Sequence, residues 1–142
     1  DEVQIRCPML FRCYRNGGDP FTKDGWYPSG DSGSLNSEGV LSVYGRMGDM
    51  IITGGENVWP VAVERSLEKV THVQECAVVG RPDPEWGEVV VAVVVAGAQR
   101  PSLEAMREAV KESLPAFCAP RSVEYVEKLP RTALGKIQRH LL

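Results

Sequence analysis

Residues Gly45–Val58, GRMGDMIITGGENV, hold the features around which the rest of the chain is organised. Arg46 offers a planar fork of N–H donors that suits phosphate or ribose oxygens. Gly48 adds backbone freedom, and Gly54 and Gly55 leave the backbone bare enough for a thin ligand to pass close to it. A cation, a pivot and bare backbone within one short stretch together predict a nucleotide site that moves.

The size and composition of the chain are those of an ordinary globular protein. Its 142 residues can bury one modest core, or form one domain with a piece of another, and 43% are hydrophobic and 25% charged. A net charge of -3 without a dense Lys/Arg stripe argues against a nucleic-acid partner. The longest apolar run, Val89–Ala98, is too short for a transmembrane segment and indicates a buried strand. No signal-peptide pattern opens the chain, and Asp1–Ile5 already alternates like a strand, so we expect a chain cut from a longer one.

The four cysteines form no C-x-x-C pair and have no zinc-like spacing with the two histidines, so we expect no metal site. They predict reduced structural thiols in a cytoplasmic protein. Cys76 falls within a strand pattern and Cys118 follows Phe117, so both are expected in the core.

Residues 1–45 predict short strands broken by turns. Strands are expected at Val3–Arg6 and Leu10–Tyr14, an acidic turn within Gly25–Asp31, and a hairpin across Leu35–Tyr44. This part has too little apolar material for a core of its own. We expect it to belong to a larger β-rich domain.

From Arg46 onward the pattern changes to alternating strands and helices. The expected strands are 50–52, 73–79, 88–96 and 121–126. One helix opens at Pro60 and a second follows the N-cap Ser102, while Arg81–Gly87 predicts a rigid loop. The predicted fold is therefore α+β, a small mixed sheet with helices packed on it.

Two positions outside the opening stretch are candidates for chemistry. Asp31 lies in a Gly-Asp turn, where its carboxylate can accept hydrogen bonds from the vicinal hydroxyls of a ribose, although an ordinary turn aspartate has the same pattern. Lys136 follows Gly135 and suits a mobile point charge that reaches a phosphate. The segment is not a nucleotide P-loop, because Pro130 and Ile137 replace the required Gly and Ser/Thr.

Two further stretches have plainer interpretations beside the functional ones. Gly54 and Gly55 are followed by Glu56 and a helix; Glu56 would repel an anion, which leaves close backbone approach of a thin ligand or a plain turn. Trp86 suits either a docking surface or packing against a loop, with packing favoured. Glu88 is expected on a solvated face.

Taken together, these stretches resemble the AMP-forming acyl-CoA synthetase superfamily, which includes aryl-CoA ligases, peptide-synthetase adenylation domains and firefly luciferase. The resemblance covers nearly the whole chain through four motifs in order: Tyr27–Asp31, Gly45–Pro60, Pro82–Glu88 and Pro130–Ile137. Two positions depart from the family pattern. Pro28-Ser29 stand in place of Arg-Thr, and Gly48 stands where the family's hinge has Asp or Lys.

The resemblance implies a two-step reaction. A carboxylate attacks the α-phosphorus of ATP to give an acyl-adenylate and pyrophosphate; the small C-terminal domain then rotates, and the thiol of coenzyme A displaces AMP. The residues that would carry these steps are Lys136 for adenylation, Asp31 and Arg46 for ATP or AMP, Gly54 and Gly55 for the CoA tunnel, and Gly48 and Asp49 for the hinge.

These implications give a definite expectation. Residues 1–45 would be the last β-rich segment of a large adenylation domain and 46–142 its C-terminal lid domain. The protein would be an acyl- or aryl-CoA synthetase that uses ATP, Mg²⁺, coenzyme A and a small carboxylic acid; the fragment alone would be largely inactive and retain no cofactor. Two alternatives stay open: an adenylation domain that loads a carrier protein, and a non-catalytic interaction module with the same fold. The sequence names no acid substrate and leaves the oligomeric state open, a homodimer included.

Overall fold

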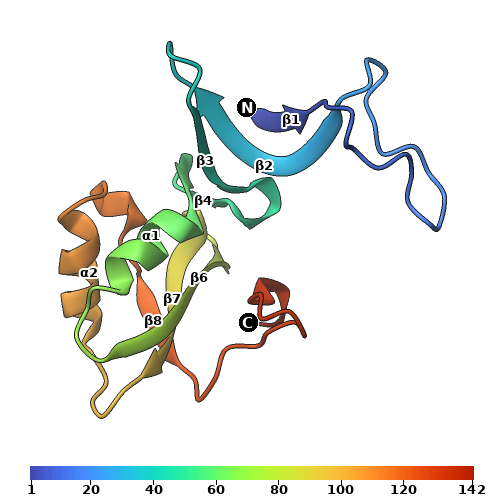
Figure 1. Cartoon of the computed structure of the whole chain (residues 1–142). Coiled ribbons are helices and arrows are strands. Elements are labelled where there is room, and N and C mark those ends of the chain that lie inside the picture. The colour runs from blue at the N-terminus through green and yellow to red at the C-terminus, as the bar shows by residue number, and fades with distance from the viewer. The chain divides into compact units, whose positions relative to one another are not determined.

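The computed structural model describes all 142 residues, which form two compact units, Asp1–Gly48 and Asp49–Leu142 (Figure 1). Each unit has its own sheet. No helix in the chain combines the length and the apolar character needed to cross a membrane.

The first unit is a three-stranded antiparallel sheet in the order β1-β2-β3. Its strands are β1 (Glu2–Ile5), β2 (Tyr27–Leu35) and β3 (Leu41–Arg46). The predicted hairpin is confirmed: Leu35 pairs with Leu41, and the Asn36 side chain accepts a hydrogen bond from the Val40 N–H at 2.8 Å in the connecting turn. All of the buried hydrophobic core residues lie in the other unit, as the composition of this part predicted.

Two local predictions for this unit are wrong. Leu10–Tyr14 forms no strand; instead the Phe11 ring packs against Tyr14 and Tyr27, with ring centroids 4.8 and 5.3 Å apart. Asp31 lies inside β2 rather than in a turn. The Gly-Asp pair has the composition of a turn, and Gly30 does adopt a positive φ of 76°. This angle distorts β2 locally but does not end the strand.

The second unit is built on a five-stranded mixed sheet. Its strands are β4 (Ile51–Thr53), β5 (Glu56–Val58), β6 (Val73–Asp83), β7 (Gly87–Ala96) and β8 (Ser122–Tyr125). The central strand is β7, which pairs with β6 along its whole length in antiparallel register, with β4 at Gly87, and with β8 in parallel register. The α+β architecture and the strands expected from periodicity are confirmed.

The two helices are α1 (Pro60–Leu67) and α2 (Leu103–Lys111). Pro60 occupies the first turn of α1, where its missing N–H costs no hydrogen bond. The Ser102 hydroxyl caps α2 by accepting a hydrogen bond from the Ala105 N–H at 3.2 Å. Both helices cover the same face of the sheet (Figure 1). Three short 3₁₀ turns complete the chain: η1 (Met47–Asp49), η2 (Ala116–Cys118) and η3 (Arg139–Leu141).

The strand β7 is buried on both faces, which explains its unbroken apolar run. Val90, Ala92 and Val94 belong to the cluster under the helices, while Val91 and Val93 belong to a cluster on the opposite face. The second cluster is covered by Leu129 and by the C-terminal residues Ile137 and Leu142. The C-terminal segment therefore takes the place that a helix layer would have on that face.

The connection between β6 and β7 is shorter than predicted. The strand β6 continues past Gly80 to Asp83, so the expected loop Arg81–Gly87 shrinks to a tight turn. Asp83 Oδ1 accepts hydrogen bonds from the N–H groups of Glu85 and Trp86 at 3.0 and 2.9 Å in that turn.

Glu88 was expected on a solvated face and is instead half-buried. Its Oε2 accepts a hydrogen bond from the Ile52 N–H at 2.9 Å, which ties β4 to β7. Its Oε1 fills the space over Gly80, where a Cβ atom would lie 2.5 Å away. The Glu88 carboxylate therefore adds a side-chain hydrogen bond between β4 and β7, where the backbone pairing is short.

Candidate active-site elements

Lys136 stands on a hydrogen-bonded loop, Arg131–Ile137, which we call the lysine loop. Arg131 and Ile137 form an antiparallel bridge at its base. Within it, the Thr132 N–H donates to the Lys136 carbonyl at 2.8 Å, and the Lys136 N–H donates to Thr132 Oγ1 at 3.1 Å. Gly135 turns the chain with a φ of 84°. Lys136 itself is exposed, so a fixed backbone presents its side chain to solvent.

The lysine loop is attached to the rest of the unit at its base. Arg131 Nη2 lies 2.5 Å from Glu75 Oε2 on β6, and its Nη1 donates to the Gly135 carbonyl at 2.7 Å. Ile137 and Leu142 pack into the cluster on the face of the sheet away from the helices. The loop tip is thus free to reach outward while its base stays on the sheet.

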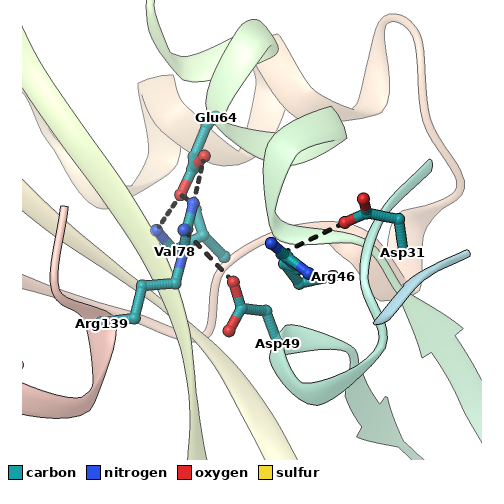
Figure 2. A network of polar contacts seen from close by, with 6 residues as sticks. All are labelled: Asp31, Arg46, Asp49, Glu64, Val78 and Arg139. Atoms are coloured by element: carbon teal, nitrogen blue, oxygen red, sulfur yellow. Dashed lines mark hydrogen bonds and ion pairs between the residues drawn. The ribbon is translucent and has the colours of Figure 1, made fainter. Parts of the chain in front are cut away.

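Three residues after Lys136, Arg139 enters a polar network (Figure 2). Its Nη2 donates to both carboxylate oxygens of Glu64 on α1, at 2.7 and 2.8 Å, and its Nη1 lies 3.4 Å from Asp49 Oδ2. Glu64 Oε1 also accepts a hydrogen bond from the Val78 N–H at 2.8 Å. Only 11% of the Glu64 side chain and 22% of the Arg139 side chain are exposed.

In the first unit, Asp31 and Arg46 face each other across β2 and β3 as paired residues. Arg46 Nε lies 3.2 Å from Asp31 Oδ1 (Figure 2), and Arg46 Nη1 donates to the Ser29 carbonyl at 2.6 Å. The Asp31 side chain is 35% exposed and that of Arg46 59%. The two residues assigned separately to a nucleotide therefore form one solvent-accessible pair.

Gly54 and Gly55 form the two-residue turn of a β4–β5 hairpin, which confirms the plain turn among the alternatives, and β5 separates them from α1. Their φ angles are 58° and 85°, and two positive angles are what the favoured two-residue hairpin turn requires. The Gly54 N–H donates to the Trp86 carbonyl at 2.9 Å, and a Cβ atom on Gly54 would lie 2.7 Å from the Trp86 ring. The Arg121 guanidinium covers that ring, 4.5 Å from its centroid. Trp86 therefore packs on the turn, as favoured from the sequence.

A hollow of about 280 Å³ lies beside this turn on the second unit. Its lining includes Gly54, Trp86, Arg107, Phe117 and Arg121. Two aromatic rings and two guanidinium groups offer stacking surfaces and anion contacts, while the Glu56 carboxylate in the same lining disfavours an anion beside the turn. This hollow was not found from the sequence, because its residues come from four separate segments.

The hinge candidates Gly48 and Asp49 lie in η1, and the boundary between the two units falls between them. No heavy atom lies within 4 Å of the place where a Cβ atom of Gly48 would be. A small side chain at position 48 would therefore meet no clash.

The thiols divide into two groups. Cys76 and Cys118 are buried, as predicted, and Cys7 and Cys13 are exposed. Burial raises the pKa of the Cys76 thiol to about 12, with Glu64 and Glu68 adding to the shift, and burial also raises the pKa of Cys118. No cluster of three or more His, Cys, Asp or Glu side chains has an arrangement that would hold a metal ion.

The sequence pattern of the family described as "AMP-binding enzyme C-terminal domain" matches residues 62–136, more than half of the chain. The chain belongs to this family. The resemblance drawn from the four motifs is thereby confirmed. The chain is 41% identical to an indoleacetate–CoA ligase of Aromatoleum aromaticum, over 97% of this chain and 28% of that protein.

Solved structures of adenylate-forming enzymes share this AMP-binding C-terminal fold. An o-succinylbenzoate CoA synthetase from Bacillus subtilis, in complex with the acyl-adenylate intermediate OSB-AMP, matches with a TM-score of 0.91 and 33% identity, over 98% of this chain and 29% of that one. An amide bond synthetase from Marinactinospora thermotolerans matches with a TM-score of 0.85 and 35% identity, over 99% of this chain and 30% of that one. The chain spans less than a third of the length of each of these relatives.

The residues that sequence reasoning missed are Arg139 and its partner Glu64. One signal was present: Glu64 lies four residues after Pro60 and three before Leu67, on the buried face of α1. A carboxylate on that face requires a cation or N–H donors. The sequence did not say which of many basic residues would supply them, because Arg139 lies 75 residues away.

Proposed function

We propose that the chain is the C-terminal part of an ATP-dependent acyl- or aryl-CoA synthetase. Residues 1–45 would close the large adenylation domain, and 46–142 would form a lid that turns on it. The observation that carries the proposal is the position of Lys136, exposed on a loop whose backbone is fixed. That arrangement suits a side chain that is delivered to a reaction centre elsewhere and later withdrawn.

In the first half-reaction, Lys136 would contact both the substrate carboxylate and the α-phosphate. The nucleophile is already ionised at neutral pH and needs no general base, so catalysis consists mainly of positioning and charge stabilisation. Asp31 would accept hydrogen bonds from the ribose hydroxyls, and Arg46 beside it would bind a nucleotide oxygen. Mg²⁺ would accompany ATP, as it does for nucleoside triphosphates in general.

In the second half-reaction, the Gly54–Gly55 turn would line the path of the CoA arm. Glycines at both central positions remove side chains from the turn, which lets a thin chain pass close to the backbone. In the hollow beside it, Trp86, Phe117 and two arginines would suit an adenine ring with phosphates, the phosphates lying on the arginines and away from Glu56.

The two steps need different groups in one pocket, and a hinged lid supplies them in turn. Gly48 is the natural pivot, since it lies at the boundary of the units without side-chain contacts at its Cβ position. Lys136 on one part of the lid and Gly54–Gly55 on another would then serve in different poses.

The test is Lys136→Ala in the full-length enzyme, with the two half-reactions measured separately. We expect ATP–pyrophosphate exchange to fall by about 10²–10³, because one preorganised cation is removed from the transition state. Thioester formation from a preformed acyl-adenylate should change less than about threefold, because Lys136 is withdrawn in that step.

Lys128→Ala is the matched control, since Lys128 is another exposed lysine of the same segment outside the lysine loop. It should leave both half-reactions unchanged. Unchanged pyrophosphate exchange in Lys136→Ala would contradict the proposal and favour a non-catalytic interaction module.

A second candidate function differs only in the molecule that accepts the activated acyl group. The likeness to an amide bond synthetase favours an enzyme that passes the activated acyl group to an amine rather than to a thiol. A carrier-protein phosphopantetheine is a third acceptor that the same lid would accommodate. Incubating the enzyme and its acyl-adenylate with CoA, an amine or a loaded carrier protein, one at a time, separates these: we expect the CoA thioester.

A further inference from the structure

We propose that Arg139 is a positioning residue, which holds the root of the lysine loop on α1 and links it to Asp49 at the hinge. The structural half of this inference stands on contacts within the second unit alone. Its consequence for catalysis rests on the proposed function, since it assumes that Lys136 acts in adenylation.

The contacts single Arg139 out among the basic residues of the C-terminal segment. One guanidinium nitrogen donates to both oxygens of the Glu64 carboxylate, and a second approaches Asp49 (Figure 2). Its Nε is buried and has no hydrogen-bond partner. The Arg139 side chain is only 22% exposed, and one of its donors has no partner. Its position therefore depends on the two carboxylates, because an unpaired charge there would be costly.

The two carboxylates hold Arg139 unequally. Glu64 is the more buried, its contacts are 2.7 and 2.8 Å, and it is itself fixed by the Val78 N–H. Asp49 is 35% exposed and its contact is 3.4 Å. The Glu64 contact therefore anchors the loop root to α1, while the Asp49 contact is the one that a backbone change at Gly48–Asp49 can release.

This inequality has a consequence for a moving lid. Because the strong contact lies within the body of the lid, the lysine loop travels with the lid in either pose. The weak contact joins Arg139 to Asp49, the proposed hinge residue. In lid poses that keep this contact, the lysine loop is held at one additional point. Lys136, three residues away, is thereby aimed most firmly in such poses.

The first experiment measures the loop directly, by amide hydrogen exchange of the intact protein. We expect Arg139→Ala to speed exchange at the hydrogen-bonded N–H groups of Thr132, Gly135, Lys136 and Gln138 about tenfold or more, with amides of β6 and β7 unchanged apart from Val78, which bonds Glu64. Lys111→Ala breaks an exposed ion pair with Glu108 on α2 and should not affect the loop.

The conservative variant Arg139→Lys keeps the charge and loses the fork, so its loop exchange should fall between wild type and Arg139→Ala. It also serves the test if Arg139→Ala does not fold. Loop exchange equal to wild type in both variants, or equally faster exchange in β6 and β7, would overturn the proposal.

The second experiment separates a positioning role from a merely structural one. In the full-length enzyme, Arg139→Ala should lower kcat of adenylation by about tenfold to a hundredfold with the KM for ATP little changed, because Lys136 is misplaced rather than lost. Thioester formation from preformed acyl-adenylate should stay within about threefold, because Lys136 is withdrawn in that step. Equal losses in both half-reactions would reduce Arg139 to a stabilising residue and overturn the proposal.

The two proposals fail in different ways. If Lys136→Ala leaves adenylation unchanged while Arg139→Ala still frees the loop amides, the proposed function is wrong and the anchoring of the loop stands. If Lys136→Ala abolishes adenylation but Arg139→Ala changes neither loop exchange nor kcat, the positioning role is wrong and the function stands.

Discussion

The buried and exposed cysteines differ at the scale of single residues. Cys76 lies on β6 and its Sγ faces α1, 3.7 Å from the Glu64 carbonyl, whereas Cys7 and Cys13 are exposed. The thiolate is the reactive form, and burial with nearby carboxylates disfavours it. Cys76 is therefore inert in the folded protein.

We predict that a thiol reagent at pH 8 modifies Cys7 and Cys13 and spares Cys76 and Cys118 until the protein unfolds. Mass spectrometry of peptides before and after denaturant would check this. Modification of Cys76 in the native protein at the rate of Cys7 would contradict its placement in the core.

The shifted pKa of Cys76 also predicts how stability depends on pH. The thiol ionises near 9 in its ordinary state and near 12 when folded, so between these values the unfolded chain loses its proton first. The contribution of Cys76 to stability is complete below pH 9 and is lost as pH rises from 9 to 12. The free energy of unfolding should fall more steeply over that range in wild type than in Cys76→Ala, measured by urea titration.

The sequence predicted the environment of a residue where local pattern decides it. It did not do so where pairing with a distant segment decides it. Cys76 was predicted in the core because strand alternation is local. The Asp31–Arg46 pair was not predicted, because it depends on the β2–β3 register. Arg139–Glu64 was missed for the same reason, at a larger separation.

At the scale of elements, the Gly54–Gly55 turn offers a controlled comparison. Both residues have positive φ, but only at Gly54 would a Cβ atom meet the Trp86 ring; at Gly55 nothing lies within 4 Å. Gly55→Ala measures the cost of the backbone conformation, about 1–2 kcal/mol. Gly54→Ala adds the overlap with Trp86, so we expect about 1–3 kcal/mol of further destabilisation in denaturant unfolding.

The double variant Gly54→Ala/Trp86→Ala isolates the overlap. It should recover the part of the loss that the Trp86 ring causes and keep the part due to φ. Equal destabilisation by Gly54→Ala and Gly55→Ala would show that Trp86 does not constrain the turn.

Elements with strong periodicity could be predicted from the sequence, and irregular ones could not. The helices that begin at Pro60 and after Ser102 have standard start signals. The unbroken apolar run of β7 predicted a buried strand. The strand β5 was missed, because three residues after a glycine pair carry no period. The expected strand Leu10–Tyr14 is absent, because its aromatic rings pack on one another and on Tyr27.

At the scale of the whole molecule, the structure divides into two compact units between Gly48 and Asp49. The sequence predicted a division after residue 45, because strand-only and strand–helix patterns differ in period. The hollow beside Gly54 and the anchoring of the lysine loop were not visible, since both join residues from distant segments. The proposed movement of the lid would depend on these long-range features and on a pivot at Gly48 together.

The proposed pivot at Gly48 makes a prediction that a second substitution at the same position controls. Gly48 has no neighbour within 4 Å of a Cβ position and lies outside the left-handed φ region, so Gly48→Ala fits without strain. Proline at the same place fixes φ and restricts Met47, so it would block the proposed change between two poses of the lid.

The most direct test of the central claim, that one lid turns between two half-reactions about Gly48, is the rate of CoA thioester formation by full-length Gly48→Pro and Gly48→Ala. The account predicts at least about a tenfold loss in the proline variant and a rate within about twofold of wild type in the alanine variant. Unaltered thioester formation in Gly48→Pro would contradict it.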